Sequence, residues 1–331
     1  MFSRMTIIAA SLALALAGCT TPLPQLAWEE APEPGDYRHF VTTPDGQARS
    51  FMIHFPKGYR PTRVYPLVVM LHGAFSNDEK AVQRTEFNQL ADRKGFIVMY
   101  PNGIGLFGLL QHWNAGFCCG KASVTSIDDV GFVMKAVNTI KRRARIDPGR
   151  IFLAGYSNGG MLAHRIASQH PDVFAALAVV AGSVGGEHPN VRQNKRPVPP
   201  GKPIPVIIFH GEQDESVPYR GGRGQETTGA YRFDSASESA RFWYSNNGCA
   251  KKPVEKTLRN GLVKLRTWCT DEENEIQNKR KTVALYTLAK WGHDWPGGFI
   301  ARKFHSEKPL YNFPTTNLIW SFFLVSSEPA Q

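Results

Sequence analysis

The sequence predicts an α/β fold in which one mostly parallel sheet carries helices on both faces. Short apolar runs recur along the chain, for example at 66–71 and 96–100, and such runs are typical of strands buried on both faces. Stretches with helical spacing separate the runs, and this alternation indicates a parallel sheet. No internal repeat or change of composition interrupts residues 37–327, so we expect a single domain there.

The hydrophobic pattern along the chain predicts the position of each strand and helix. The predicted strands cover 49–55, 66–71, 96–100, 151–155, 173–181, 205–210 and 282–288. The predicted helices cover 79–94, 158–169 and 315–324, and a further helix is capped by Asp128 and ends near Arg145. Residues 185–203 are rich in glycine, proline and basic residues, and we expect a surface loop there.

The first residues form a predicted export signal. Arg4 supplies a positive charge, and the apolar stretch 5–17 is too short to span a bilayer. The stretch ends in Leu16-Ala17-Gly18-Cys19, which resembles the lipobox of bacterial lipoproteins, where the cysteine becomes the acylated first residue. An ordinary secretory signal is the alternative. We therefore expect residues 1–18 to be removed and Cys19 to carry lipid, which would anchor the chain to a membrane.

A proline-rich stretch follows the signal. Residues 19–36 contain four prolines, and we expect them to tether the lipid to the domain. Thr20 is not the aspartate that typically keeps such lipoproteins at the inner membrane. The sequence therefore predicts an exported lipoprotein attached to the outer membrane, in the periplasm or at the cell surface, or extracellular if it is released.

The excess of basic over acidic residues is interpreted as a solvated basic surface. The formal net charge is +11, but the lysines and arginines are scattered except at 141–145. That run lies where a helix is expected to end, and the helix dipole favours cations there. No nucleic-acid motif accompanies it, so nucleic acid is not expected as a partner. We expect a monomer.

A motif at 155–159 carries the strongest chemical signal. It reads Gly-Tyr-Ser-Asn-Gly, which is the pattern G-x-S-x-G. An apolar strand precedes it and a helical pattern follows, which is the setting of the nucleophile elbow in the α/β-hydrolase fold. The sharp turn strains the serine backbone and leaves no room for side chains on the flanking residues. Ser157 is therefore the predicted nucleophile, and the expected fold is that of an α/β-hydrolase.

The partners of Ser157 are expected downstream, because the chain order in this fold is serine, acid, histidine. Asp214 lies a few residues after an apolar strand and is the predicted acid, with Glu212 and Glu215 as alternatives. His293 lies after the last strand, on a loop rich in glycine and proline. A histidine so placed suits a general base, and we predict that role for it.

Two backbone N–H groups are expected to form an oxyanion hole. One belongs to Asn158, the residue after the nucleophile. The other is expected from the loop 71–75, with Ala74 as the first choice and Phe75 as the next. His72 is expected to brace this loop rather than to react.

Four cysteines remain after Cys19. An even number in an exported chain suggests disulfides. Cys249 and Cys269 flank a predicted hairpin, and a bridge between them would close a short loop. Cys118 and Cys119 are adjacent and could form a bridge or remain thiols. No histidine lies near either pair at ligand spacing, so a metal site is not expected.

Together these motifs resemble the polyhydroxybutyrate depolymerase and feruloyl esterase group of α/β-hydrolase serine esterases, including the LpqC-type lipoprotein esterases of bacteria. The resemblance runs from about residue 51 to 323. It rests on His72-Gly73, Trp113-Asn114-Ala115-Gly116, Cys118-Cys119-Gly120, Asp128–Phe132, Gly155–Gly160, His210-Gly211 with Asp214 and Val217-Pro218-Tyr219, Asn247-Gly248-Cys249, and Gly292-His293 with Trp295-Pro296-Gly297.

The resemblance implies specific roles. It implies Ser157, Asp214 and His293 as a catalytic triad, and a disulfide between Cys249 and Cys269. It also implies that Trp113, Trp295 and the loop of Cys118 and Cys119 border the substrate. One departure is Trp291, which stands where a glycine is expected and would narrow the acyl pocket.

The expected activity is that of a serine carboxylic-ester hydrolase that forms an acyl-enzyme and needs no metal or organic cofactor. The expected substrates are 3-hydroxybutyrate oligomers or hydroxycinnamoyl (feruloyl) esters on polysaccharide. A serine peptidase of the same fold and a non-catalytic lipoprotein that binds an envelope ligand are the alternatives.

Overall fold

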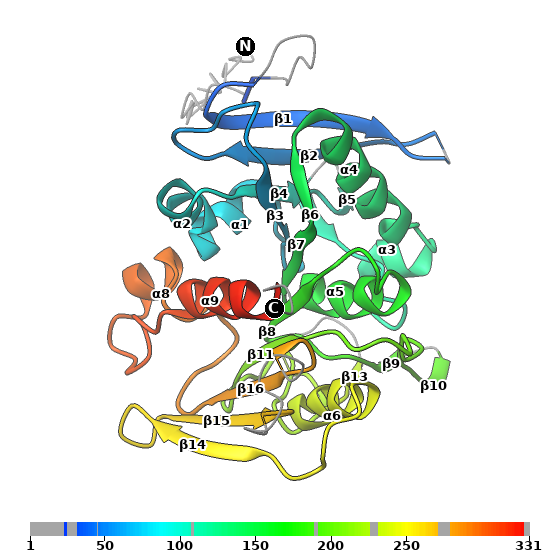
Figure 1. Ribbon diagram of the computed structural model, residues 1–331. Helices are drawn as coiled ribbons and strands as arrows, with labels where there is room; N and C mark the ends of the chain where they lie inside the picture. The colour runs from blue at the N-terminus through cyan, green and yellow to red at the C-terminus, as the bar shows by residue number, and fades with distance from the viewer. Residues whose placement is uncertain are drawn as a thin grey trace, which may run out of the picture.

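A ten-stranded sheet runs through the computed structural model (Figure 1). In spatial order its strands are β1 (Gly35–Thr42), β2 (Ala48–Phe55), β4 (Ile97–Pro101), β3 (Tyr65–Leu71), β7 (Ile146–Tyr156), β8 (Ala176–Val180), β11 (Val206–Gly211), β16 (Val283–Leu288), β15 (Val263–Trp268) and β14 (Val254–Leu258). The six strands from β4 to β16 are parallel, and antiparallel strands extend both edges. The predicted α/β class is confirmed.

The structure describes residues 23–24, 32–44, 46–106, 109–188, 191–225, 231–270 and 279–327. The expected signal peptide 1–18 and Cys19 lie outside these residues. In the expected tether, the carbonyl of Pro24 accepts a hydrogen bond from Arg38 N at 3.0 Å, and Leu23 packs against the core. This part of the tether therefore lies against the domain. In the described ranges, no helix has both the length and the apolar character needed to cross a bilayer.

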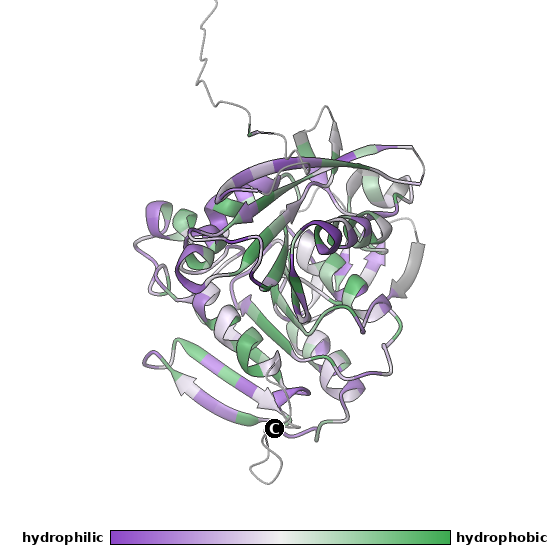
Figure 2. Ribbon diagram, turned by 45° about the horizontal axis from the view of Figure 1, so that its top comes forward, coloured by the Kyte–Doolittle hydropathy of each residue, from purple (hydrophilic) through white to green (hydrophobic). Residues whose placement is uncertain are grey.

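The parallel strands form because their apolar runs are buried on both faces. Every residue of β3, β4, β8 and β11 is buried. Figure 2 shows this pattern as hydrophobic strands inside the molecule and hydrophilic residues on the outer turns of the helices. Burial of these runs is the main favourable contribution to folding, at about 25 cal/mol per Å² of apolar surface.

Helices cover both faces of the sheet (Figure 1). One face packs against α4 (Asp129–Arg143), α5 (Asn158–Gln169) and α6 (Ala236–Asn246). The other packs against α1 (Asp78–Thr85), α2 (Phe87–Lys94), α8 (Phe299–Phe304) and α9 (Thr315–Ser327). The Asp128 side chain accepts from Gly131 N at 2.9 Å, so the predicted cap of α4 is present.

The structure differs from the sequence-based expectation in two elements. The single helix expected at 79–94 is two helices, because Glu86 adopts the left-handed conformation with φ 55° and ends α1. The loop expected at 185–203 contains β9 (Gly186–His188) and β10 (Val191–Lys195). These pair with β12 (Gly222–Arg223) and β13 (Arg232–Phe233) in a separate four-stranded sheet.

Several elements were not predicted, among them α6, α8 and two smaller elements near the loop that follows β3. A hairpin of β5 (Ile104–Leu106) and β6 (Leu109–His112) lies beside the loop that follows β3, through a bridge between Ser76 and Gln111. A short helix, α3 (Gly120–Val124), follows this hairpin.

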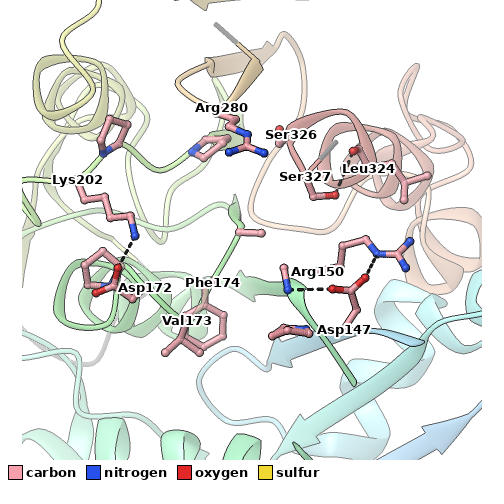
Figure 3. A pocket seen from close by; sticks show the side chains of 16 residues that line it. Asp147, Arg150, Asp172, Val173, Phe174, Lys202, Arg280, Leu324, Ser326 and Ser327 are labelled. Carbon is pink, nitrogen blue, oxygen red and sulfur yellow. Dashed lines mark hydrogen bonds and ion pairs between the residues drawn. The ribbon is translucent and has the colours of Figure 1, made fainter. Parts of the chain in front are cut away.

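A cavity of about 860 Å³ opens at the amino ends of β7, β8 and β11 (Figure 3). Its walls include two ion pairs, Arg150 with Asp147 and Lys202 with Asp172, and the end of α9. Ligands in parallel α/β sheets bind at the carboxyl ends of the strands. The residues of the predicted site follow those carboxyl ends, so this cavity lies at the opposite edge of the sheet.

Candidate active site

Ser157 lies on a strained turn between β7 and α5. Its φ of 54° and ψ of −123° place it in a region that residues other than glycine rarely adopt, at a cost of about 1–3 kcal/mol. The flanking glycines are required sterically. A Cβ at Gly155 would collide with the Gly159 carbonyl, and a Cβ at Gly159 would collide with the carbonyls of Leu71 and His72. The turn therefore holds Ser157 at the carboxyl edge of the sheet.

The structure brings Ser157, His293 and Asp214 together. His293 Nε2 is 2.9 Å from Ser157 Oγ, and His293 Nδ1 is 2.8 Å from Asp214 Oδ2. Asp214 follows β11 and His293 follows β16, so the parallel strands deliver all three side chains to one edge of the sheet. The alternative acids, Glu212 and Glu215, are exposed.

Asp214 is held as a carboxylate. Its burial would raise the pKa, but the charges and hydrogen bonds of His293 and His210 outweigh burial and hold the pKa of Asp214 well below its ordinary value. The other oxygen, Oδ1, accepts from Val217 N at 2.8 Å. A charged acceptor on Nδ1 of His293 fixes the tautomer in which Nε2 is free to take a proton from Ser157.

The loop after β3 lies directly against the nucleophile. A Cβ built on Gly73 would be 3.2 Å from Ser157 Cβ, so the segment that carries Ala74 contacts the nucleophile residue. Asn158 is the first residue of α5, so its backbone N–H has no partner inside the helix. The two predicted oxyanion donors therefore lie on segments that contact each other.

His72 supports this loop from behind. Its Nδ1 is 2.7 Å from the Gly73 carbonyl, and its Nε2 accepts from Gly103 N at 3.0 Å. Burial lowers the pKa of His72 to about 4, so the ring is neutral at pH 7. Since Nε2 accepts a hydrogen bond, the ring proton lies on Nδ1 and is donated to Gly73.

The expectation that Trp113 and Trp295 border the substrate needs correction, because both side chains have 0 % exposure. Trp113 Nε1 donates to the His72 carbonyl at 2.8 Å, and the Asn158 side chain bonds to both backbone polar groups of Trp113. Trp295 Nε1 donates to Thr316 Oγ1 at 3.0 Å. Buried indoles with internal partners support loops and do not face a substrate.

Trp291 is also part of the core. It is 1 % exposed, and its Nε1 donates to the Asp294 carbonyl at 3.0 Å. It therefore stabilises the histidine loop from inside and does not narrow an acyl pocket.

The structure contains two disulfides among the four cysteines that follow Cys19. Cys249 and Cys269 form a disulfide with a Cα–Cα distance of 5.1 Å, across the hairpin of β14 and β15. Cys118 and Cys119 are also paired, and a cis peptide joins them. Cys118 packs in a small apolar cluster with Met161 of α5, one turn after the nucleophile.

Sequence patterns did not predict the contacts that Phe75, His210 and Tyr156 make around the site. Phe75 follows Ala74 with φ 58°, its side chain is 48 % exposed, and its ring lies 4.4 Å from that of His112. His210 Nε2 lies 3.4 Å from Asp214 Oδ2, and Tyr156 bonds to the histidine loop. Tyr156 occupies a variable position of the motif, so no pattern could single it out.

Comparisons with known proteins agree with this fold. Residues 49–195 match the family described as Esterase PHB depolymerase. Feruloyl esterase B of Piromyces equi is 31% identical over 214 residues, which are 64% of this chain and 38% of that protein. The bifunctional acetylxylan esterase/xylanase XynS20E of Neocallimastix patriciarum is 27% identical over 175 residues, which are 53% of this chain and 23% of that protein. The chain thus covers less than half of the length of either relative.

A solved structure supports the fold. The acetyl xylan esterase from Aspergillus awamori superposes with a TM-score of 0.55 at 15% sequence identity, over 78% of this chain and 94% of that chain. The resemblance inferred from the motifs is confirmed: the chain has an α/β-hydrolase fold, and its residues 49–195 match the model of the Esterase PHB depolymerase family.

Proposed function

We propose that the chain is a serine carboxylic-ester hydrolase that works through an acyl-enzyme on Ser157. The observation that carries this proposal is the continuous contact from Ser157 Oγ through His293 to the buried carboxylate of Asp214. The relatives named above are esterases, which favours an ester over the peptide bond of a peptidase. A lipoprotein that only binds a ligand has no need of this arrangement.

The proposed reaction uses each group in turn. His293 Nε2 takes the proton of Ser157 as Oγ attacks the ester carbonyl, and the N–H groups of Ala74 and Asn158 stabilise the negative charge on oxygen. His293 then protonates the departing alcohol, which leaves the acyl-enzyme. The same imidazole activates a water that hydrolyses this intermediate. Asp214 keeps the imidazole oriented and stabilises its charged form.

The proposed substrates are hydroxycinnamoyl or acetyl esters on polysaccharide, with 3-hydroxybutyrate oligomers as the second candidate. The names of the relatives support the polysaccharide esters. The exposed ring of Phe75, one residue from a proposed oxyanion donor, supplies apolar surface for an aromatic acyl group.

The remaining expectations from the sequence form part of the same proposal. We propose an exported chain with residues 1–18 removed, a lipid on Cys19 that attaches it to the outer membrane, and a single catalytic domain over 37–327 that acts as a monomer. An exported location agrees with the paired cysteines and would give the enzyme access to polymeric esters.

The first test measures acid release from p-nitrophenyl butyrate, methyl ferulate, acetylated xylan and 3-hydroxybutyrate oligomers. The mature chain is compared with Ser157→Ala, and an anilide serves as the peptide-like control. Hydrolysis that is lost in the variant supports the proposal and ranks the substrates. Turnover of the anilide alone, or no turnover that depends on Ser157, contradicts it.

A further inference from the structure

The residue before the nucleophile contacts the loop that carries the catalytic histidine. Tyr156 ends β7, and its hydroxyl donates to the backbone carbonyl of His293 at 2.9 Å. The two rings lie 5.3 Å apart at 34°. Gly73 packs on the Tyr156 ring, since a Cβ there would be 2.9 Å from Cδ1. Tyr156 therefore contacts the histidine loop and the proposed oxyanion loop at once.

A partly buried ion pair holds the same loop one residue further on. Arg84 Nη1 pairs with Asp294 Oδ1, and the Arg84 guanidinium lies 4.8 Å from the centre of the Tyr156 ring. Asp294 Oδ1 also accepts from Trp295 N at 2.8 Å. The second oxygen, Oδ2, lies 3.7 Å from His305 Nε2. The side chain of Asp294 is only 10 % exposed, so removal of Arg84 would leave a poorly solvated charge in the loop.

Helix α1 presents Arg84 from a fixed position. The carbonyl of Thr85 accepts from Thr316 Oγ1 at 2.6 Å, and Thr316 in turn accepts from Trp295 Nε1. Gly298 lies against the Arg84 carbonyl, where any side chain would collide. The end of α1, the start of α9 and the histidine loop thus form one packed unit.

We propose that Tyr156 and the Arg84–Asp294 ion pair are positioning residues that hold the His293 imidazole in register with Ser157. This inference rests on the proposed esterase function. The imidazole must keep contacts of 2.9 and 2.8 Å with two groups that belong to other loops. A displacement of about 1 Å in such a group can lower a rate by about 100-fold. Two anchors on consecutive residues fix the backbone from which the imidazole projects.

The test compares Tyr156→Phe with Tyr100→Phe. Each variant loses one buried hydroxyl in the same sheet. Tyr100 lies in β4, which β3 separates from β7, and its hydroxyl donates to Asn88 Oδ1 at 2.7 Å. We expect Tyr156→Phe to lower kcat roughly 10- to 100-fold with KM within about twofold, and Tyr100→Phe to keep both. Labelling of Ser157 by a fluorophosphonate, which needs no ester substrate, should slow by a similar factor.

Arg84 gives a second set of variants if Tyr156→Phe fails to fold. Arg84→Met should lower kcat several-fold, and Arg84→Lys should restore part of it by keeping the charge. The double variant Tyr156→Phe with Arg84→Met should lose less than the product of the single losses, because both free the same loop.

Three results would overturn the inference. The first is a kcat of Tyr156→Phe within twofold of wild type, and the second is an equal loss of kcat in Tyr156→Phe and Tyr100→Phe. The third is a rise in the KM of Tyr156→Phe at constant kcat, which would place Tyr156 against the substrate. A wild-type protein that neither hydrolyses esters nor reacts with the fluorophosphonate would instead contradict the proposed function.

Discussion

Replacing Asp214 by asparagine is the most informative single change, because the structure dictates how the new side chain must orient. Oδ1 of Asp214 accepts from Val217 N at 2.8 Å, so the amide oxygen of asparagine would keep that place. The amide NH₂ would then face His293 Nδ1, 2.8 Å from the present Oδ2. A donor there forces the imidazole proton onto Nε2, where it blocks proton transfer from Ser157.

The expected loss follows from this wrong tautomer. The corresponding Asp→Asn change in a serine protease triad lowers kcat by about 10⁴, which corresponds to about 5.5 kcal/mol in the barrier. Stability should change as well. The pKa of Asp214 is lower in the folded than in the unfolded chain, so the carboxylate stabilises the fold above its ordinary pKa of about 4. That stabilisation is lost as the pH falls through the lowered folded pKa.

The assay measures kcat for an ester that the wild-type chain hydrolyses, and unfolding by urea at pH 7 and at acid pH. Asp78→Asn is the matched control, because Asp78 is 1 % exposed and pairs with Arg38 at 2.8 Å. It should lose stability with kcat within about twofold. Activity of Asp214→Asn within tenfold of wild type would refute the reasoning, and a large loss in Glu212→Gln or Glu215→Gln would identify another acid.

Three further predictions concern stability. Burial lowers the pKa of His164 to about 3, so the free energy of unfolding should fall as the pH drops below about 6.5, by at most about 5 kcal/mol. The Tm of His164→Gln should therefore depend less on pH between 6 and 4 than the Tm of the wild type. Serine at both Cys249 and Cys269, which are 20 residues apart, should lower the free energy of unfolding in urea by about 3 kcal/mol. Gly159→Ala should lower both Tm and kcat, because its Cβ would meet backbone carbonyls. Gly149→Ala should lower neither, because its Cβ would lie 3.5 Å from the nearest atom, Asp147 Oδ1.

Each stability prediction has an outcome that contradicts it. An unchanged pH slope in His164→Gln would show that another group drives acid unfolding. Equal urea midpoints with and without the disulfide would mean that the loop is not entropically constrained in the unfolded chain. A fully active Gly159→Ala would show that helix α5 can move away from the loop after β3.

The motifs on loops after strands were readable from the sequence because their positions follow from topology. Ser157, Asp214 and His293 each follow an apolar run, and parallel strands place their carboxyl ends at one edge of the sheet. The break at Glu86 and the second sheet at 186–195 were not readable. A left-handed residue and short strands leave no periodic signal, since tertiary contacts decide both.

The sequence by itself therefore determined the fold class, the nucleophile elbow and the order of the proposed triad. These depend on patterns within a few residues and on the chirality of βαβ connections. Tertiary structure alone decided that Trp113 and Trp295 are buried supports and that Tyr156 and Arg84 contact the histidine loop. Those contacts join residues that lie between 21 and 210 positions apart, and no local pattern encodes which of them meet.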